Sequence, residues 1–389
     1  MINVDTSSRL KELPPYLFAE IDKIKKKAIS EGKDIIDLGV GDPDRPTPMH
    51  IIEQLYEAAK DAKNHRYAMD MGLLKLRETI ATWYKRRFDV ELDPESEVLP
   101  LIGSKEGIVH MPLAYVNHGD EVLIPDPCYP PYKSGTIFAG GVPYLMPLLP
   151  ENDFLPDLGA IDYQVARRAK IMFLNYPNNP TSAVATEEFF KRVIEYANEN
   201  NIIICHDAAY SEMSYDGYKP PSFLEFEGAK DVGVEFHSLS KTYNMTGWRL
   251  GFVCGKADVV SALRKVKSNI DSGIFQPVQF AGIVALESDQ SHIDKLNAIY
   301  QRRRDVLVDG LNSIGWKVKK PKATFYVWIP VPPGYTSNEL TKSLLEKADI
   351  VTTPGVGFGP NGEGYIRITL TVPEERLQEA VDRIKRLHQ

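Results

Sequence analysis

One short stretch of the sequence places a lysine among hydroxyl groups. In SLSKTYNMTGWRLGFVCG, residues 238–255, Lys241 follows two serines and Arg249 comes eight residues later. A lysine amine can form a Schiff base with an aldehyde, and serine hydroxyls with an arginine can hold a phosphate. The stretch by itself also fits a polar turn with a solvated lysine, so its chemistry depends on the residues that join it.

Other reactive side chains follow short apolar runs that are typical of buried strands. DPCYPPY follows EVLIP (121–125), NYPNNPT follows KIMFL (170–174), HDAAY follows NIIIC (201–205) and HSLSK follows VGVEF (232–236). In an open α/β sheet, ligands bind beyond the carboxyl ends of the strands. We therefore expect these residues to meet at one edge of a sheet.

Together these residues suit one ligand, a pyridine ring that carries an aldehyde, a phenolic oxygen and a phosphate. Lys241 would bind the aldehyde, and Asp207 would keep the ring nitrogen protonated so that the ring accepts the electrons of a carbanion. Tyr129 would stack on the ring, while Asn179 and Tyr210 would hydrogen-bond its phenolic oxygen. The phosphate would be held at a helix opened by GSKEG (103–107), by Ser104, Ser238, Ser240 and Arg249.

The elements that must position these residues alternate between strand and helix. A helix should begin near Thr47, which would cap it, and another should follow Thr186 with apolar residues at helical spacing. Such alternation predicts an α/β protein whose large domain has three layers, αβα, around a mostly parallel sheet.

The character of the sequence changes near residue 290. A long charged helix, a strand within ATFYVWIPV, the strand YIRITL and a final amphipathic helix indicate a smaller α+β domain. In YIRITL, Ile366 and Ile368 point to one face and Arg367 to the other, toward a cleft. We expect an N-terminal arm and part of the small domain in residues 1–45, the large domain in 46–288 and the small domain in 289–389.

Composition and charge exclude several classes of protein. The 389 residues are 43% hydrophobic and 25% charged, with a net charge of −7, which is ordinary for a globular protein. The basic runs KIKKK (23–27) and RRR (302–304) are interpreted as solvated helix faces, so no nucleic-acid partner is expected. No apolar run is long enough for a signal peptide or a membrane span, which favours a cytoplasmic protein. Three scattered cysteines and no H-E-x-x-H indicate neither a disulfide framework nor a metal site.

The order of these motifs resembles a known family over nearly the whole chain. G-S-K-E-G, N-x-P-N-N-P-T, D-A-A-Y, S-x-S-K, G-W-R-x-G and a late Y-I-R-I are similar to the fold-type I pyridoxal-phosphate aminotransferases of classes I and II. The resemblance implies pyridoxal 5'-phosphate on Lys241, with Asp207 and Tyr210 assisting catalysis. It implies that Arg367 takes the substrate α-carboxylate, together with the backbone of Gly41. It also implies a homodimer with shared active sites, in which Tyr67 reaches the partner subunit's phosphate.

A narrower resemblance concerns the substrate. LPPYLFAEID (13–22), GVGDPDRPTP (39–48) and SNIDSGIFQPVQ (268–279) look like the LL-diaminopimelate aminotransferases, which use tetrahydrodipicolinate and glutamate. This match implies that Tyr16, Lys105 and Asn269 contact the distal groups of the substrate, Asn269 from the other subunit. Lys105 would also lie beside the cofactor, and Tyr129 and Asn179 beside the substrate. The chain departs from that family at Ser182, where a glycine is usual, so this serine would strain or reshape the loop.

Three other functions stay open at this point. The same scaffold serves aspartate or alanine aminotransferases of broader specificity, and it serves carbon–sulfur β-lyases and related elimination enzymes. A non-enzymatic regulator that binds pyridoxal phosphate is a remote alternative. A screen of amino donors in half-reactions would separate these functions.

Overall fold

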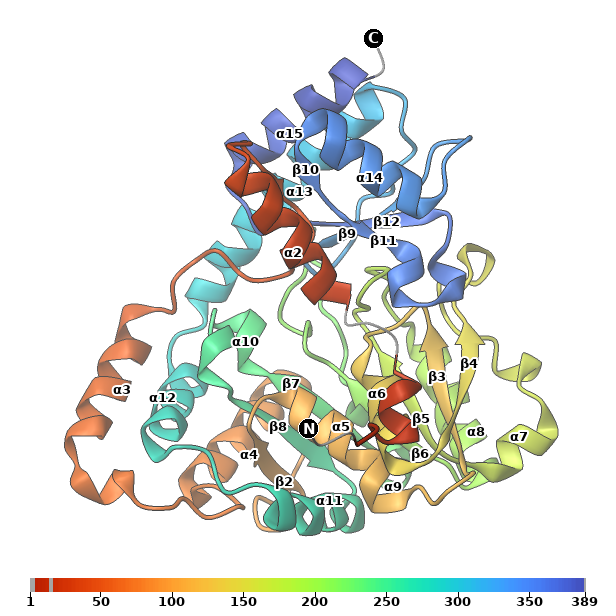
Figure 1. The fold of residues 1–389 in the computed structure, drawn as a ribbon. Coiled ribbons are helices and arrows are strands. Elements are labelled where there is room, and N and C mark those ends of the chain that lie inside the picture. The colour runs from red at the N-terminus through yellow and green to blue at the C-terminus, as the bar shows by residue number, and fades with distance from the viewer. Residues whose placement is uncertain (1–3, 14–16, 388–389) are drawn as a thin grey trace.

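The computed structural model describes residues 4–13 and 17–387, in which a large α/β body carries a smaller one (Figure 1). A seven-stranded sheet has the order β2-β8-β7-β6-β5-β3-β4, and β8 runs antiparallel to both of its neighbours while the other pairs are parallel. The predicted α/β class with a mostly parallel sheet is confirmed. The strands are β2 (Val98–Leu101), β3 (Glu121–Asp126), β4 (Val142–Pro147), β5 (Ala169–Asn175), β6 (Ile203–Asp207), β7 (Gly233–Ser238) and β8 (Gly251–Gly255).

Helices cover both faces of this sheet, which gives the three predicted layers. Along β7 the side chains alternate, so Val234 and Phe236 enter one core while Glu235 and His237 point to the opposite face. The core containing Phe236 is closed by α5 (Ser104–Tyr115), α6 (Pro131–Ala139) and α11 (Ala257–Ile270). The opposite core is closed by α4 (Leu74–Phe88), α8 (Glu187–Asn200), α9 (Ala229–Val232) and α12 (Gln276–Glu287).

The two predicted helix starts fare differently. Thr186 caps α8 as expected, since its side chain accepts a hydrogen bond from the Phe189 N–H. The predicted cap at Thr47 is wrong, because α3 (Met49–Lys60) has Pro48 at its N-cap. The Thr47 hydroxyl instead donates to the Asn244 carbonyl at 2.7 Å, which ties this segment to the loop after Lys241.

The smaller body is built from both ends of the sequence. β11 (Thr353–Pro354), β12 (Tyr365–Thr369) and β9 (Tyr326–Pro330) form an antiparallel sheet, and β1 (Ile36–Asp37) pairs in parallel with β10 (Ile350–Val351). Figure 1 shows α13 (Ser291–Ser313), α14 (Ser337–Ala348) and α15 (Glu374–Leu387) around these strands. The pairing of β1 agrees with an N-terminal share in the small domain, whereas the boundaries at residues 46 and 289 stay predictions.

The interpretation of the run RRR as a solvated face is wrong for two of its members. Arg303 and Arg304 are buried; Arg303 donates to both carboxylate oxygens of Asp44, at 2.8 and 2.7 Å, and Arg304 pairs with Asp216. The KIKKK run lies in α2 (Leu17–Ser30), where Lys27 is exposed as expected. A charge run alone does not show that carboxylates distant in sequence fold against it.

Two further features concern the whole described chain. The three cysteines, Cys128, Cys205 and Cys254, are all free and buried. Within residues 4–13 and 17–387, no helix is both long enough and apolar enough to cross a membrane. The shorter helices are α1 (Ser8–Lys11), which lies against α6, α7 (Tyr163–Arg168) and α10 (Leu239–Thr242).

Candidate active site

A cavity of about 300 Å³ lies beyond the carboxyl ends of β5, β6 and β7, and a size of this order suits a small-molecule site. The structure brings most of the predicted site residues together in its wall. Tyr67 and Asn269 lie outside it, and Tyr16 lies outside the described residues. The predicted residues that line the cavity are Gly41, Ser104, Lys105, Tyr129, Asn179, Asp207, Tyr210, Ser238, Ser240, Lys241, Arg249 and Arg367.

Lys241 projects into the cavity from α10, the short helix that follows β7. The Ser238 side chain caps this helix by accepting from the Ser240 N–H. Lys241 Nζ donates to the Gly41 carbonyl oxygen at 3.1 Å. Burial lowers the pKa of Lys241 to about 8, and the charges of Arg367 and Arg249 act in the same direction while Asp42 opposes them. A substantial share of this lysine is therefore a neutral nucleophilic amine near physiological pH.

Asp207 ends β6 and is 4% exposed. Its Oδ2 accepts from the Tyr132 hydroxyl at 2.8 Å, and its Oδ1 accepts from the Ala209 N–H at 3.3 Å. Burial raises the pKa of Asp207, and the hydrogen bond from Tyr132 opposes that rise. A cation held against this carboxylate would keep it ionised. Sequence reasoning missed Tyr132, although its place three residues after Tyr129, at the start of α6, was the available signal.

A cradle for an anion forms where β2 passes into α5. Gly103 has φ +73°, and a Cβ there would lie 2.3 Å from Arg249 Nη2. A Cβ at Gly251 would lie 2.7 Å from the backbone nitrogen of Ser104, the first residue of α5. Gly103 is thus required for the close approach of the helix N-terminus, whose N–H groups favour an anion, to the arginine, and Gly251 for the close approach of β8 to the same N-terminus.

Arg367 lies on β12 and is 1% exposed. Its guanidinium carbon is 4.1 Å from the ring centre of Tyr326 and 4.6 Å from that of Phe358. Nη1 donates to Asn179 Oδ1 at 2.7 Å, and Nη2 donates to the Gly39 carbonyl at 2.8 Å. Both acceptors are uncharged, and two aromatic rings lie close to the guanidinium, so its positive charge is available to a carboxylate bound bidentately.

Five residues that line the cavity were not predicted from the sequence: Val40, Asn175, Ala209, Thr246 and Tyr326. Asn175 accepts from the Asn179 N–H at 2.7 Å and donates to the Asp207 carbonyl at 2.6 Å, so it joins the ends of β5 and β6. Tyr326 accepts a hydrogen bond from the Tyr210 hydroxyl at 3.0 Å. Nothing in the run ATFYVWIPV distinguishes this tyrosine from its neighbours.

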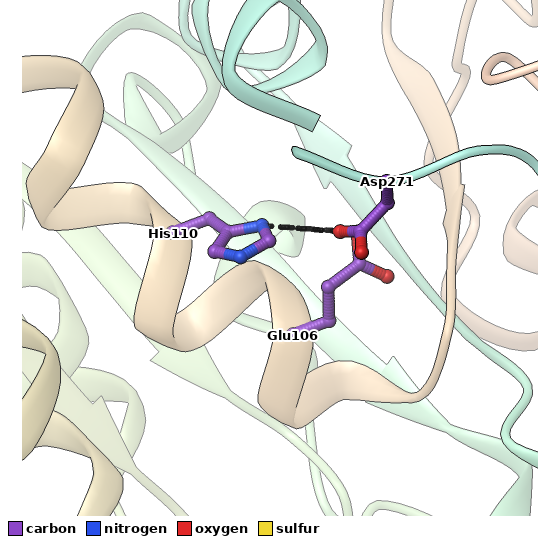
Figure 2. Close-up of side chains that lie close together, drawn as sticks. All are labelled: Glu106, His110 and Asp271. Carbon is purple, nitrogen blue, oxygen red and sulfur yellow. Dashed lines mark ion pairs between the residues drawn. The ribbon is translucent and has the colours of Figure 1, made fainter. Parts of the chain in front are cut away.

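A second polar cluster lies beside the cradle, on α5 and just after α11 (Figure 2). His110 Nδ1 lies 3.7 Å from Asp271 Oδ2 and 3.8 Å from Glu106 Oε1, so the three side chains have the composition of a metal site. However, the fully buried Lys267 places its ammonium 2.8 Å from Glu106 Oε1. The lysine supplies positive charge to the carboxylates, and we assign the cluster to the packing of α11 against α5.

Known proteins are similar to this chain over nearly its whole length. The family model of the class I and II aminotransferases matches residues 33–384. The chain belongs to the class I and II aminotransferases. It is 58% identical to the LL-diaminopimelate aminotransferase of Moorella thermoacetica, over 97% of both chains, and 58% identical to that of Syntrophobacter fumaroxidans, over 98% of both. The substrate-bound structure of BacF from Bacillus subtilis superposes with a TM-score of 0.96 at 41% identity, covering 99% of this chain and 98% of that one.

This aminotransferase uses pyridoxal 5'-phosphate, the cofactor of its family. The cavity fits that group, because it combines a lysine amine of lowered pKa, a buried carboxylate and an anion cradle that a Cβ at Gly103 would obstruct. The assignment of each residue to a part of the cofactor or substrate is a proposal and follows below.

Proposed function

We propose that this aminotransferase is an LL-diaminopimelate aminotransferase, which makes LL-diaminopimelate and 2-oxoglutarate from tetrahydrodipicolinate and glutamate by a ping-pong cycle in lysine biosynthesis. The name is supported by curated relatives at 52–58% identity over nearly the full chain. The observation that carries the chemistry is the convergence of Lys241, Asp207 and Arg367 on one cavity. A cytoplasmic location belongs to the same proposal and is tested by cell fractionation.

In this proposal the large body holds the cofactor. The N-terminus of α5 with Arg249 binds the phosphate, Asp207 pairs with the ring nitrogen, and Lys241 takes the aldehyde. Tyr129 lies against the ring, with Asn179 and Tyr210 at its phenolic oxygen. Ser104, Ser238 and Ser240 complete the phosphate site with their hydroxyls. When bound, the cofactor supplies an electron sink for the bond that breaks at the substrate α-carbon.

The chain's own residues bind and orient the substrate. Arg367 donates a bidentate pair of hydrogen bonds to the α-carboxylate, beside the backbone of Gly41. Once the substrate amine has displaced it from the aldehyde carbon, Lys241 Nζ would take the α-proton and deliver it to that carbon of the cofactor. A base with a pKa near the operating pH is suited to both directions of this transfer, and the pKa of about 8 for Lys241 meets that condition.

The distal end of LL-diaminopimelate carries an ammonium and a carboxylate that need partners, because a buried unpaired charge costs several kcal/mol. Lys105 lines the cavity, and burial together with the charge of Arg249 lowers its pKa. We assign it to the distal carboxylate and to the side-chain carboxylate of glutamate. Tyr16 and Asn269 are proposed to complete this end of the pocket.

A homodimer is part of the proposal, and an apolar surface supports it. Tyr67 is 93% exposed, and Met69, Ile270 and Phe275 are also exposed. The segment with Tyr67 and Met69 touches the segment with Ile270 and Phe275, since the Gly273 N–H donates to the Ala68 carbonyl at 3.2 Å. Large apolar side chains gathered on one surface are typical of a protein contact. A second copy seated there would receive Tyr67 and Asn269 at its own active site.

Subunit mixing tests the shared site. Lys241→Ala and Tyr67→Ala chains are each expected to be inactive or weak, and mixing them should restore activity because one site of each mixed dimer is intact. Verified exchange without any gain in activity would refute the shared site.

Half-reactions test the substrate. Enzyme loaded with cofactor is mixed in single turnover with LL-diaminopimelate, meso-diaminopimelate, lysine, aspartate, alanine or glutamate, and the change in cofactor absorption is followed. We expect fast reaction with LL-diaminopimelate and glutamate alone. Equal rates with aspartate or alanine would indicate a broader aminotransferase, and pyruvate released from cystathionine without a 2-oxo acid would indicate a β-lyase.

A further inference from the structure

Tyr326 connects two parts of the cavity that the proposed function uses separately. Its hydroxyl is the hydrogen-bond partner of Tyr210 at 3.0 Å, and its ring covers the guanidinium of Arg367 at 4.1 Å. The same hydroxyl fills the space beside Gly41, where a Cβ would lie 2.2 Å from it. One side chain therefore touches the carboxylate site, the tyrosine that faces the cofactor, and the backbone that accepts from Lys241.

The backbone of Tyr326 is held by a closed chain of hydrogen bonds. Its N–H donates to Thr324 Oγ1 at 3.0 Å, the Thr324 hydroxyl donates to Ser182 Oγ at 3.0 Å, and the Ser182 hydroxyl donates to the Tyr326 carbonyl at 2.7 Å. We call these three residues the hydroxyl ring. Every donor in it has an acceptor, and all three residues are buried. The ring joins β9 to the loop that carries Asn179.

Ser182 adopts φ +60°, the left-handed conformation that favours glycine. The expected strain at this position is therefore present, and the side chain explains why a serine occupies it. A glycine would adopt the backbone angle freely but would leave the Thr324 hydroxyl and the Tyr326 carbonyl without their present partner.

We propose that Tyr326 is a positioning residue that aligns the carboxylate-binding Arg367 with Tyr210, and that Ser182 fixes Tyr326 in place through the hydroxyl ring. The inference deepens the proposed function and rests on the roles assigned there to Arg367 and Tyr210. Both hydroxyls rotate freely, so Tyr326 donates to Tyr210 when Tyr210 turns its own proton toward the cofactor. A tyrosine that accepts such a bond becomes a stronger donor, since linked hydrogen bonds polarise one another.

The groups around Tyr210 determine how a substitution changes a pH titration of the bound cofactor. The titratable groups that face its phenol are Tyr326, Arg367 and Asp207. Substitution of Tyr326 by phenylalanine leaves the two charged groups in place and removes one hydroxyl. Tyr210 should then donate less strongly to the cofactor, so the nitrogen contributed by Lys241 becomes more basic.

The test uses the enzyme loaded with cofactor and two readouts other than turnover. The first is the pH midpoint of the change in cofactor absorption, and the second is the dissociation constant of glutarate, a dicarboxylate without an amino group. For Tyr326→Phe we expect the midpoint to rise by about 0.5 pH unit, a 3-fold change in the proton equilibrium, with glutarate affinity nearly kept. For Tyr326→Leu, which removes the ring from Arg367, we expect glutarate affinity to fall about 10-fold.

Ser182→Gly should raise the pH midpoint and lower the glutarate affinity, each by less than the Tyr326 variants do. The effect is smaller because glycine keeps the backbone angle and removes only the hydroxyl. In the double variant Ser182→Gly/Tyr326→Phe the midpoint should equal that of Tyr326→Phe. The hydroxyl ring affects the midpoint only through the side-chain hydroxyl of Tyr326, which this variant lacks. Tyr176→Phe is the matched control, as its buried hydroxyl donates to the Phe154 carbonyl at 2.8 Å outside the cavity.

Two results would overturn the inference: a midpoint that is the same in Tyr326→Phe, Tyr176→Phe and the unaltered enzyme, or a Ser182→Gly variant with a lower melting temperature and both readouts unchanged. An unaltered enzyme that binds no cofactor would instead refute the proposed function before any variant is compared.

Discussion

The anion cradle allows a direct test of the phosphate site, by adding one methyl group at Gly103. Gly103→Ala places a Cβ 2.3 Å from Arg249 Nη2 and also forces alanine into φ +73°. Gly119→Ala is the matched control, since Gly119 has φ +84° and nothing lies within 4 Å of the Cβ position. Both variants carry the backbone strain, and only the first displaces the arginine.

The expected magnitudes follow from these two effects. Alanine in the left-handed region costs about 1 to 2 kcal/mol, so both variants should lose about that much free energy of unfolding. A hydrogen bond to a charged group contributes about 1.5 to 3 kcal/mol, so displacement of Arg249 should weaken cofactor binding about 10- to 150-fold. Gly119→Ala should bind the cofactor as tightly as the unaltered enzyme.

Equilibrium dialysis of pyridoxal 5'-phosphate against the apo-protein measures the affinity, and denaturant titration measures the stability. The reasoning fails if Gly103→Ala and Gly119→Ala bind the cofactor equally well, because Arg249 would then have no share in the phosphate site. It fails equally if both variants lose affinity together, because the loss would then come from general destabilisation.

Three further predictions concern the substrate, the lysine and the buried acid. Arg367→Lys should lower kcat/KM about 10²-fold for donor and acceptor alike, because an ammonium cannot form the bidentate pair. Steady-state rates for both substrates measure this, and a loss confined to one substrate would assign Arg367 to the side-chain pocket instead. Covalent capture of added cofactor by Lys241 should rise with pH through a midpoint near 8 and level off above it, since only the neutral amine reacts; a stopped-flow midpoint near 10.5, that of an ordinary lysine, would contradict the burial argument. Tyr132→Phe removes the donor that opposes the raised pKa of Asp207, so cofactor affinity should fall about 3- to 10-fold. The fall should be largest at low pH, where the carboxylate is more easily protonated. Dialysis across a pH series measures the affinity, and an unchanged affinity would show that this bond is unimportant.

The strand-end residues could be predicted because a parallel sheet fixes where its ends meet. Asp207 and Lys241 each follow an apolar run, and the period of the strands and helices is enough to place both runs in one sheet. Glycines near residue 103 and the serines around Lys241 then follow from the chemistry of an anion at a helix start. These inferences need only local patterns and one rule of topology.

The remaining features depend on contacts between distant segments, which no local pattern records. Arg303 is paired with Asp44, 259 residues away in the sequence, so its burial could not be predicted from the charged run that contains it. Tyr326 lines the cavity because β9 meets the loop of Ser182, a contact across 144 residues. The roles of Tyr67 and Asn269 depend on the proposed homodimer and stay predictions.

The pairing of β1 with β10 helps to join the segment after β1 to the strand that carries Arg367. Gly39 accepts from Thr353 Oγ1 at 3.0 Å and from Arg367 at 2.8 Å, so the segment after β1 and the arginine on β12 form one rigid unit. Lys241, on α10, and Asp207, at the end of β6, belong to the large body. Arg367 also donates to Asn179 Oδ1 at 2.7 Å, and the Tyr210 hydroxyl donates to Tyr326 at 3.0 Å, so the arginine is tied to both bodies. The separation of Arg367 from Lys241 therefore depends on contacts made by both bodies, and a substitution that disturbs either set of contacts can change it from outside the cavity.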